Sequence, residues 1–311
     1  MGKQSRLILL YGDVSPRHDG KYQWMIDGKC TCGYRPYAEK YGIIIYLTKQ
    51  TVREPWEFSI INSSKVISFI SKRPDAVVWS IKHGRIKDRQ ILSKISNKKI
   101  YYSCCAARMY NPYCDVSLVD TKSRLAKNAK LWMKGKDPAY WRPCGRKEFD
   151  YLLIGKRADK NEILFLQKLQ SRVRDKRRVL WIGGHKHRDQ VRSMRLKHHV
   201  EFIKFGISQK VVRDNIPKAR VGILFTQHPR EGFPQSFIEM TMSGVPVVYS
   251  NTGPRNKFYF FDENSVIANK GNLIEKSEYL LRHHDPEACR QCAIRNYSLE
   301  VSAHHLLDLV K

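Results

Sequence analysis

The sequence has no run of about 18 consecutive apolar residues, so it lacks the pattern of a membrane-spanning helix. It has no signal-peptide pattern at Met1–Arg6, which lead directly into an apolar run, and we therefore expect a cytoplasmic protein. It also has no Asp-x-Asp pair, and without that carboxylate arrangement we expect no metal cofactor.

Acidic residues are scarce: there are 29 of them against 57 Lys and Arg, which gives a net charge of +28 and a pI of about 9.9. Residues 156–220 alone contain 19 Lys and Arg and 6 Asp and Glu, a local net charge of +13 (19 − 6). A surface with this excess attracts a long polyanion such as DNA, or an anionic membrane. The composition does not imply a protein partner.

The eight cysteines occur without a signal sequence, so we expect reduced thiols rather than disulfides. Cys289 and Cys292 have the two-residue spacing of a zinc site and several histidines nearby, but no second clean ligand pair accompanies them. Whether they bind zinc stays open from the sequence.

The chain length of 311 residues and the 42% hydrophobic content suit two packed domains. Short apolar runs separated by helical patterns recur in both halves and predict buried parallel strands. A Pro- and Gly-rich stretch between them indicates a linker. We therefore expect domains over residues 1–130 and 150–297, a linker over 131–149, and a C-terminal helix over 298–311 that crosses back to the first domain.

The stretch from Arg220 to Gly253 has the pattern of a strand, loop, helix and strand. Val221–Phe225 is the first strand. Ser236 is a predicted N-cap that forms a capping box with Glu239, and the helix is expected to end near Met242, with Gly244 as its C′ glycine. Pro246 begins the next strand, so the loops lie at the carboxyl ends of parallel strands, where open α/β sheets bind ligands.

Two carboxylates in this stretch, Glu231 in the loop and Glu239 in the helix, are eight positions apart. Carboxylates accept hydrogen bonds strongly from vicinal hydroxyls, and N–H groups at the helix start suit a diphosphate. The spacing alone also fits a less specific interpretation, a capping glutamate and a surface glutamate in an ordinary α/β domain.

The residues Glu231-Gly232-Phe233-Pro234 with Glu239, followed by Gly244-Val245-Pro246-Val247-Val248, resemble the E-G-F-P-x-x-x-x-E signature of retaining nucleotide-sugar glycosyltransferases with the GT-B fold. The resemblance covers residues 150–255 well and residues 1–130 only in strand order. It implies an α/β fold with GT-B architecture, in which two Rossmann-like doubly wound domains face a central cleft. It also implies a nucleotide-diphosphate sugar as donor, a UDP-sugar being expected, and transfer with retention.

The resemblance implies roles for particular residues. Glu231 would contact the transferred sugar, Glu239 the ribose, and Gly232, Phe233 and Pro234 would bring backbone N–H groups near the sugar. The Gly155-Lys156-Arg157 turn with Lys160 resembles the family's pair of cations, which neutralise the donor diphosphate and the leaving-group charge. Gly183, in the turn after a further predicted strand, is added to the donor site. The altered spacing leaves open whether Lys156 or Arg157 takes the arginine role.

The acceptor side is less well marked. Asp13, His18 and His83 are the candidates, because they follow predicted strands of the first domain. The sequence departs from the family here: glycines are few after the first strand, and Cys104 and Cys105 stand where the family often has a histidine.

The charge favours a polyanionic acceptor, for which a hydroxylated base in viral or phage DNA is the first hypothesis; a viral enzyme would work in the host cytoplasm. Reaching such a base requires extruding it from the duplex. One alternative is a glycosyltransferase that acts on lipid-linked or cell-surface glycans at an anionic membrane. Another is a non-catalytic nucleic-acid-binding protein on this fold.

Overall fold

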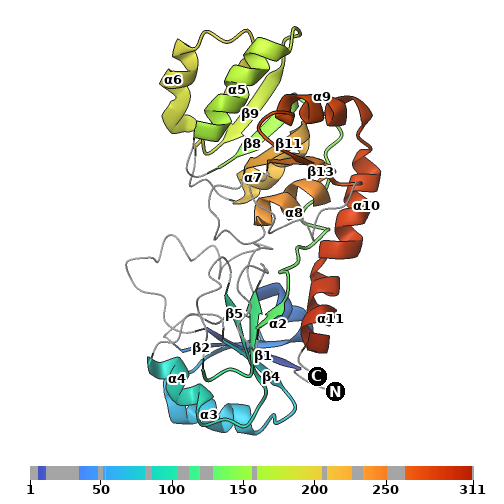
Figure 1. Ribbon diagram of the computed structural model, residues 1–311. Coiled ribbons are helices and arrows are strands. Elements are labelled where there is room, and N and C mark those ends of the chain that lie inside the picture. Colours follow the sequence, from blue (N-terminus) through green and yellow to red (C-terminus); the bar gives the residue numbers. More distant parts are fainter. Residues whose placement is uncertain are drawn as a thin grey trace. The chain divides into compact units, whose positions relative to one another are not determined.

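The structure is a computed structural model, shown in Figure 1, and it describes residues 6–11, 35–47, 52, 54–80, 86–103, 112–119, 129–155, 160–204, 209–225, 234–250 and 263–309. In these ranges no helix is long and apolar enough to cross a membrane. The chain divides into two compact units: residues 1–135 with 299–311 form unit 1, and residues 136–298 form unit 2. The stretch expected as a linker, 131–149, is divided between the units after Gly135.

Unit 1 is built on a seven-stranded sheet in the order β3-β2-β1-β4-β5-β6-β7, and every pairing in it is parallel. The strand order reverses between β1 and β4, as in a doubly wound fold. The strands are β1 (Leu7–Tyr11), β2 (Gly42–Tyr46), β3 (Glu57–Ser59), β4 (Val77–Ser80), β5 (Lys99–Ser103), β6 (Val116–Val119) and β7 (Ala129–Leu131).

Helices cover both faces of this sheet, and the central strand β1 serves both cores because successive side chains of a strand point to opposite faces (Figure 1). Leu7 and Leu9 pack with α2 (Arg35–Tyr41) and α11 (Leu299–Leu309). Ile8 and Leu10 pack with α3 (Ser63–Ser71) and α4 (Ile86–Leu92). A strand buried on both faces must be apolar throughout, which explains the LILLY sequence of β1.

The C-terminal helix α11 is part of unit 1, although the whole of unit 2 separates it in sequence from the sheet it covers. Its Ser302 is the polar centre of the contact. The Ser302 Oγ lies 2.9 Å from the Tyr37 hydroxyl and accepts from the Gly135 N–H at 3.0 Å, and the Ser302 carbonyl accepts from Trp132 Nε1 at 2.8 Å. The segment that ends unit 1 is thereby fixed to the returning helix.

Unit 2 has a six-stranded, entirely parallel sheet in the order β10-β9-β8-β11-β12-β13, which reverses between β8 and β11. The prediction of two doubly wound α/β domains is confirmed by the two sheets. The strands are β8 (Phe149–Ile154), β9 (Arg178–Ile182), β10 (His199–Ile203), β11 (Ala219–Phe225), β12 (Val247–Ser250) and β13 (Ser265–Ala268). The helices are α5 (Lys160–Arg172), α6 (Arg188–Ser193), α7 (Gln209–Asn215), α8 (Gln235–Met242), α9 (Leu273–His283) and α10 (Pro286–Tyr297).

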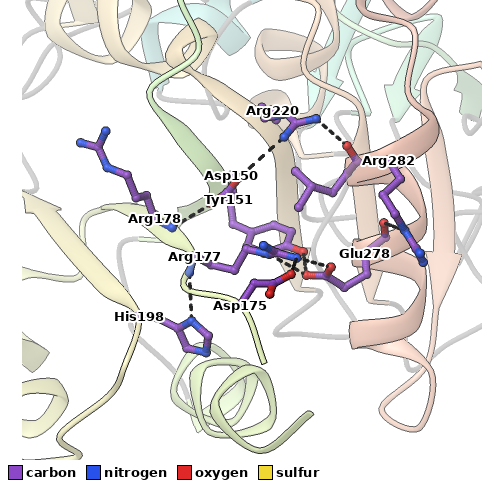
Figure 2. Close-up of polar contacts among 10 residues, drawn as sticks. Asp150, Tyr151, Asp175, Arg177, Arg178, His198, Arg220, Glu278 and Arg282 are labelled. Atoms are coloured by element: carbon purple, nitrogen blue, oxygen red, sulfur yellow. Dashed lines mark hydrogen bonds and ion pairs between the residues drawn. The ribbon is translucent and has the colours of Figure 1, made fainter. Parts of the chain in front are cut away.

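A network of charged and polar side chains lies at the amino ends of the strands in unit 2 (Figure 2). This edge of the sheet is opposite the one where doubly wound folds bind ligands. Arg177, just before β9, binds Glu278 of α9 through two nitrogens, Nη2 at 2.7 Å and Nε at 3.1 Å. The Tyr151 hydroxyl donates to the same carboxylate at 2.6 Å. Burial alone would raise the pKa of Glu278, but the hydrogen bonds from Arg177 and Tyr151 outweigh it and lower that pKa.

His198, just before β10, belongs to the same network, because its Nδ1 accepts a hydrogen bond from the Arg177 N–H at 3.1 Å. Burial is the main cause that lowers the pKa of His198. It outweighs the Leu169 backbone and the Glu278 charge, which raise that pKa, and the charges of Lys197 and Arg177 add to the lowering. Protonation of Nδ1 would remove the acceptor. The neutral imidazole is therefore the form that fits the fold.

We expect unit 2 to lose stability as the pH falls below about 6.5, the ordinary pKa of histidine. Folding lowers the pKa of His198, and burial lowers the pKa of His284 as well. As the pH falls, both histidines therefore bind a proton in the unfolded chain before they do so in the folded one. The lowered pKa of Glu278 adds a loss of the same sign at more acidic pH. Urea unfolding followed from pH 7.5 to pH 4 measures this effect.

His198→Asn is the control variant, because the Asn Oδ1 takes the position of Nδ1 as an acceptor but does not titrate. Its urea midpoint should fall less between pH 7 and pH 5 than that of the wild type. If the urea midpoint of the variant falls as much as that of the wild type, His198 does not contribute to the loss of stability at low pH.

Candidate functional site

The candidate site lies at the carboxyl ends of β8 and β11, the neighbouring strands between which the strand order of unit 2 reverses. The two strands are in register, with Ile223 opposite Leu153. Ligands of open α/β sheets bind at this topological switch point. The segments that follow the two strands, 155–159 and 226–233, contain most of the predicted donor residues.

Two of the predicted glycines end adjacent strands at this edge. The Gly155 N–H, directly after β8, donates to the Ile182 carbonyl of β9 at 3.1 Å, and the Gly183 N–H, directly after β9, donates to the Ile203 carbonyl of β10 at 2.8 Å. Gly183 has φ +97°, a conformation that residues with a Cβ rarely adopt. The backbone at both positions ends a strand at the edge where the donor is predicted to bind.

Helix α8 follows the β11 loop and ends at Met242, as the sequence predicts, but it begins earlier than predicted. The helix begins at Gln235 after Pro234 (φ −69°, ψ 121°), with no side-chain cap. The predicted N-cap at Ser236 and its capping box with Glu239 are therefore wrong. The predicted C′ glycine is confirmed, since Gly244 has φ +69° directly after the C-cap residue of α8.

Glu239 is instead paired with a residue 103 positions earlier in the chain. Its Oε1 accepts a hydrogen bond from Lys136 Nζ at 2.7 Å. The Lys136 side chain is 0% exposed and the Glu239 side chain 11% exposed. An ammonium group taken out of water must be paired, so the pair keeps Glu239 ionised and able only to accept hydrogen bonds.

The helix that carries Glu239 is packed on several sides. Met240 lies over Gly222 of β11 so closely that a Cβ at Gly222 would stand 2.3 Å from the Met240 sulfur. At the other end, Arg290 of α10 donates to the carbonyls of Met242, Trp141 and Pro138, the last at 3.0 Å. A cation at the carbonyl end of a helix is favourable, and here it also binds the segment after Lys136 to α8.

The structure does not describe the side chains of the other predicted site residues, apart from Pro234. Lys160 begins α5, but its side chain is outside the described part. The following predicted residues lie outside the described residues altogether, and their roles stay predictions: Lys156, Arg157, Glu231, Gly232, Phe233, Asp13, His18 and His83.

Lys136 is the residue that the sequence pattern did not reveal. It lies in a Lys-Gly-Lys-Asp-Pro stretch typical of a solvated linker, and lysine is rarely buried unless it is paired. One indirect indication of a buried segment is present in the sequence: two tryptophans, Trp132 and Trp141, flank the stretch, and both are buried in the structure. Lys136 Nζ lies 5.9 Å from the centroid of the Trp141 ring, within cation–π range.

The two cysteines considered for zinc lie in the core of unit 2. Cys289 Sγ donates to the Thr241 carbonyl at 3.6 Å, and Cys292 Sγ accepts from Asn264 Nδ2 at 3.4 Å. Burial raises the pKa of the Cys289 thiol, which disfavours the thiolate that a metal requires. The described ranges contain no group of three or more His, Cys, Asp or Glu side chains that could hold a metal ion.

Residues 148–293 match the family model described as Glycosyl transferases group 1. The match contains β8 to β13 and helix α8, and therefore the candidate site. A sequence comparison with curated proteins found no match.

Solved glycosyltransferase structures share the fold over almost the whole chain. A glycosyltransferase from Rickettsia africae has a TM-score of 0.65 at 13% identity, with 98% of this chain and 97% of that one covered. Anabaena HepE in complex with UDP and glucose has a TM-score of 0.63 at 10% identity, with 97% and 98% covered. Sucrose-phosphate synthase from Thermosynechococcus elongatus has a TM-score of 0.65 at 12% identity, with 98% of both chains covered. The predicted GT-B fold is confirmed by these structures, and the prediction of a glycosyltransferase is confirmed by the family match over residues 148–293.

Proposed function

We propose that the chain transfers a sugar from a UDP-sugar to an acceptor with retention of the anomeric configuration. The observation that carries the donor half is the Glu239 carboxylate, held ionised by Lys136 on the helix that follows the switch-point strand β11. HepE, a neighbour of the same fold, binds UDP and glucose. Retention is supported by the E-G-F-P-x-x-x-x-E signature.

In this proposal the two glutamates recognise different parts of the donor. Glu239 accepts hydrogen bonds from the ribose hydroxyls, and Glu231 from those of the transferred sugar, because ionised carboxylates suit vicinal diols. Lys160, with Lys156 or Arg157, neutralises the diphosphate as its charge grows on leaving. Fixed cations at this position do the work that a metal ion does in other transferase folds.

For the acceptor, we propose a polyanion, and specifically a hydroxylated base in viral or phage DNA, modified in the cytoplasm. Support comes from a basic surface, defined as the nine exposed Lys and Arg side chains from the end of α5 to the start of β10. Only Asp175 and Asp189 offset it within that range. Its residues are Arg172, Arg174, Lys176, Arg178, Lys186, Arg188, Arg192, Arg195 and Lys197.

Such a surface suits the phosphate backbone, which accounts for most sequence-independent affinity for DNA. Phosphate contacts position the duplex and carry no base information, so the modified base must be recognised elsewhere, after extrusion from the stack. The proposal therefore separates a binding surface for backbone from a reaction site for one nucleotide.

We expect radiolabelled UDP-sugar to label DNA that contains 5-hydroxymethylated bases and to leave unmodified DNA unlabelled. The measurement is label retained on the DNA after incubation with each of several UDP-sugars. A Glu239→Gln variant serves as the inactive control, because it keeps the side-chain shape and removes the charge. Label that appears on lipid-linked or cell-surface glycan, and on none of the DNAs, would overturn the DNA acceptor and leave the donor half standing.

A further inference from the structure

The Lys136–Glu239 pair differs from the other ion pairs of the described residues in its burial. Each remaining pair keeps at least 16% of both side chains exposed, whereas the Lys136 side chain is fully buried. Exposed pairs contribute little, but a buried ammonium costs several kcal/mol in lost hydration that its partner must offset. An apolar pair would fill this space without the loss of hydration, so a contribution to stability does not explain why two charged residues stand here.

The backbone of Lys136 fixes where its ammonium can lie. Its N–H donates to the Tyr297 carbonyl at 3.0 Å, and it forms a parallel β-bridge with Ser298. Lys136 is the first residue of unit 2 and Ser298 the last. The segment that enters the unit and the segment that leaves it are thus joined at the residue that binds Glu239.

The Glu239 carboxylate is held in place by the packing of helix α8, which carries it. Every residue from Phe237 to Met242 is buried, and Phe237 packs edge-on against Tyr297 with ring centroids 6.0 Å apart. The 11% of the Glu239 side chain that remains exposed is what a ligand can reach. A carboxylate has about four lone-pair positions, and the bond from Lys136 occupies one of them.

We propose that Lys136 is a positioning residue for the donor site: it holds the Glu239 carboxylate ionised and in one orientation, in which it accepts hydrogen bonds from the vicinal hydroxyls of the nucleotide ribose. The proposal rests on the proposed function, which gives Glu239 the ribose. Preorganised acceptors bind more tightly because no ordering is required when the ligand arrives. Lys136 acts on the ligand only through Glu239.

The test compares two nucleotides that differ only in the ribose hydroxyls, UDP and 2′,3′-dideoxy-UDP. Their dissociation constants are measured by calorimetry for the wild type, Lys136→Met, Glu239→Gln and the double variant. We expect Lys136→Met to weaken UDP binding by about 10- to 100-fold, the size of a charge-assisted hydrogen bond. The same variant should bind 2′,3′-dideoxy-UDP as the wild type does, and the double variant should lose no more UDP affinity than Glu239→Gln.

A merely structural role predicts a different pattern. If Lys136→Met weakens both nucleotides equally while Glu239→Gln weakens UDP but not 2′,3′-dideoxy-UDP, the positioning role is wrong and the donor site stands. If Glu239→Gln leaves the preference for UDP over 2′,3′-dideoxy-UDP unchanged, or the wild type binds no UDP, the proposed function fails first. Should Lys136→Met not fold, Lys136→Gln keeps a hydrogen-bond donor without the charge and is subject to the same comparison.

Discussion

Glu239→Ala is expected to weaken binding of a UDP-sugar by about 100-fold or more, and separately to destabilise the fold. The variant removes the carboxylate that is proposed to accept from the ribose. It also leaves the Lys136 ammonium, which is 0% exposed, without its partner at 2.7 Å. Isothermal titration with UDP-glucose measures the first loss, and unfolding in urea measures the second.

Two controls separate these losses. Glu275→Ala removes an exposed glutamate of α9 in the same unit and should change neither quantity. Lys136→Met with Glu239→Leu replaces the whole pair by apolar side chains, a change that is often neutral or stabilising for buried ion pairs. This double variant should regain stability and still fail to bind. UDP-sugar binding that survives Glu239→Ala would remove the basis of the donor site.

Binding of duplex DNA is expected to fall by about 10³- to 10⁵-fold between 50 and 200 mM salt, the loss typical of six to ten neutralised phosphates. The reason is counterion release: each phosphate neutralised by the basic surface frees condensed cations, and added salt reverses the gain. The measurement is the slope of the logarithm of the binding constant against the logarithm of salt concentration. Acidic lipid vesicles should compete poorly.

A charge-matched pair of variants locates the effect. Replacing Arg192, Arg195 and Lys197 with glutamine should reduce the slope by about 0.9 for each lost phosphate contact. Replacing Lys65, Lys72 and Lys94, which are exposed on unit 1, removes the same charge and should leave the slope nearly unchanged. Equal effects of the two triple variants would contradict a binding surface on unit 2 and would indicate a general effect of net charge.

The central strands and the C-terminal end of α8 could be predicted because their determinants are local. An apolar run such as that of β1 has few other stable arrangements, and a glycine after an amphipathic stretch marks a helix end, as Gly244 does. Helix α10 is likewise capped locally, since Asp285 accepts from the N–H groups of Glu287 and Ala288. In each case the signal lies within a few residues of the feature.

Features that depend on distant residues were missed. Strands β3 and β7 have three residues each and lie at the two edges of their sheet, and their pairing with β2 and β6 defines them more than any pattern of their own. The Ser236 cap was wrong because local spacing cannot show that the Glu239 carboxylate is bound by Lys136. The sequence thus indicated Glu239, Gly155 and Gly183 as candidate residues, but not Lys136, which binds Glu239.

The return of α11 to unit 1 has a consequence for how the protein is made. Leu299, Ala303 and Leu306 belong to the same core as Leu7 and Leu9, so the first sheet to be synthesised has part of one face uncovered until some 160 further residues have been translated. Unit 2 contains all its own strands and helices and can fold as soon as it leaves the ribosome. During synthesis unit 2 is therefore complete before unit 1, although unit 1 begins earlier in the gene.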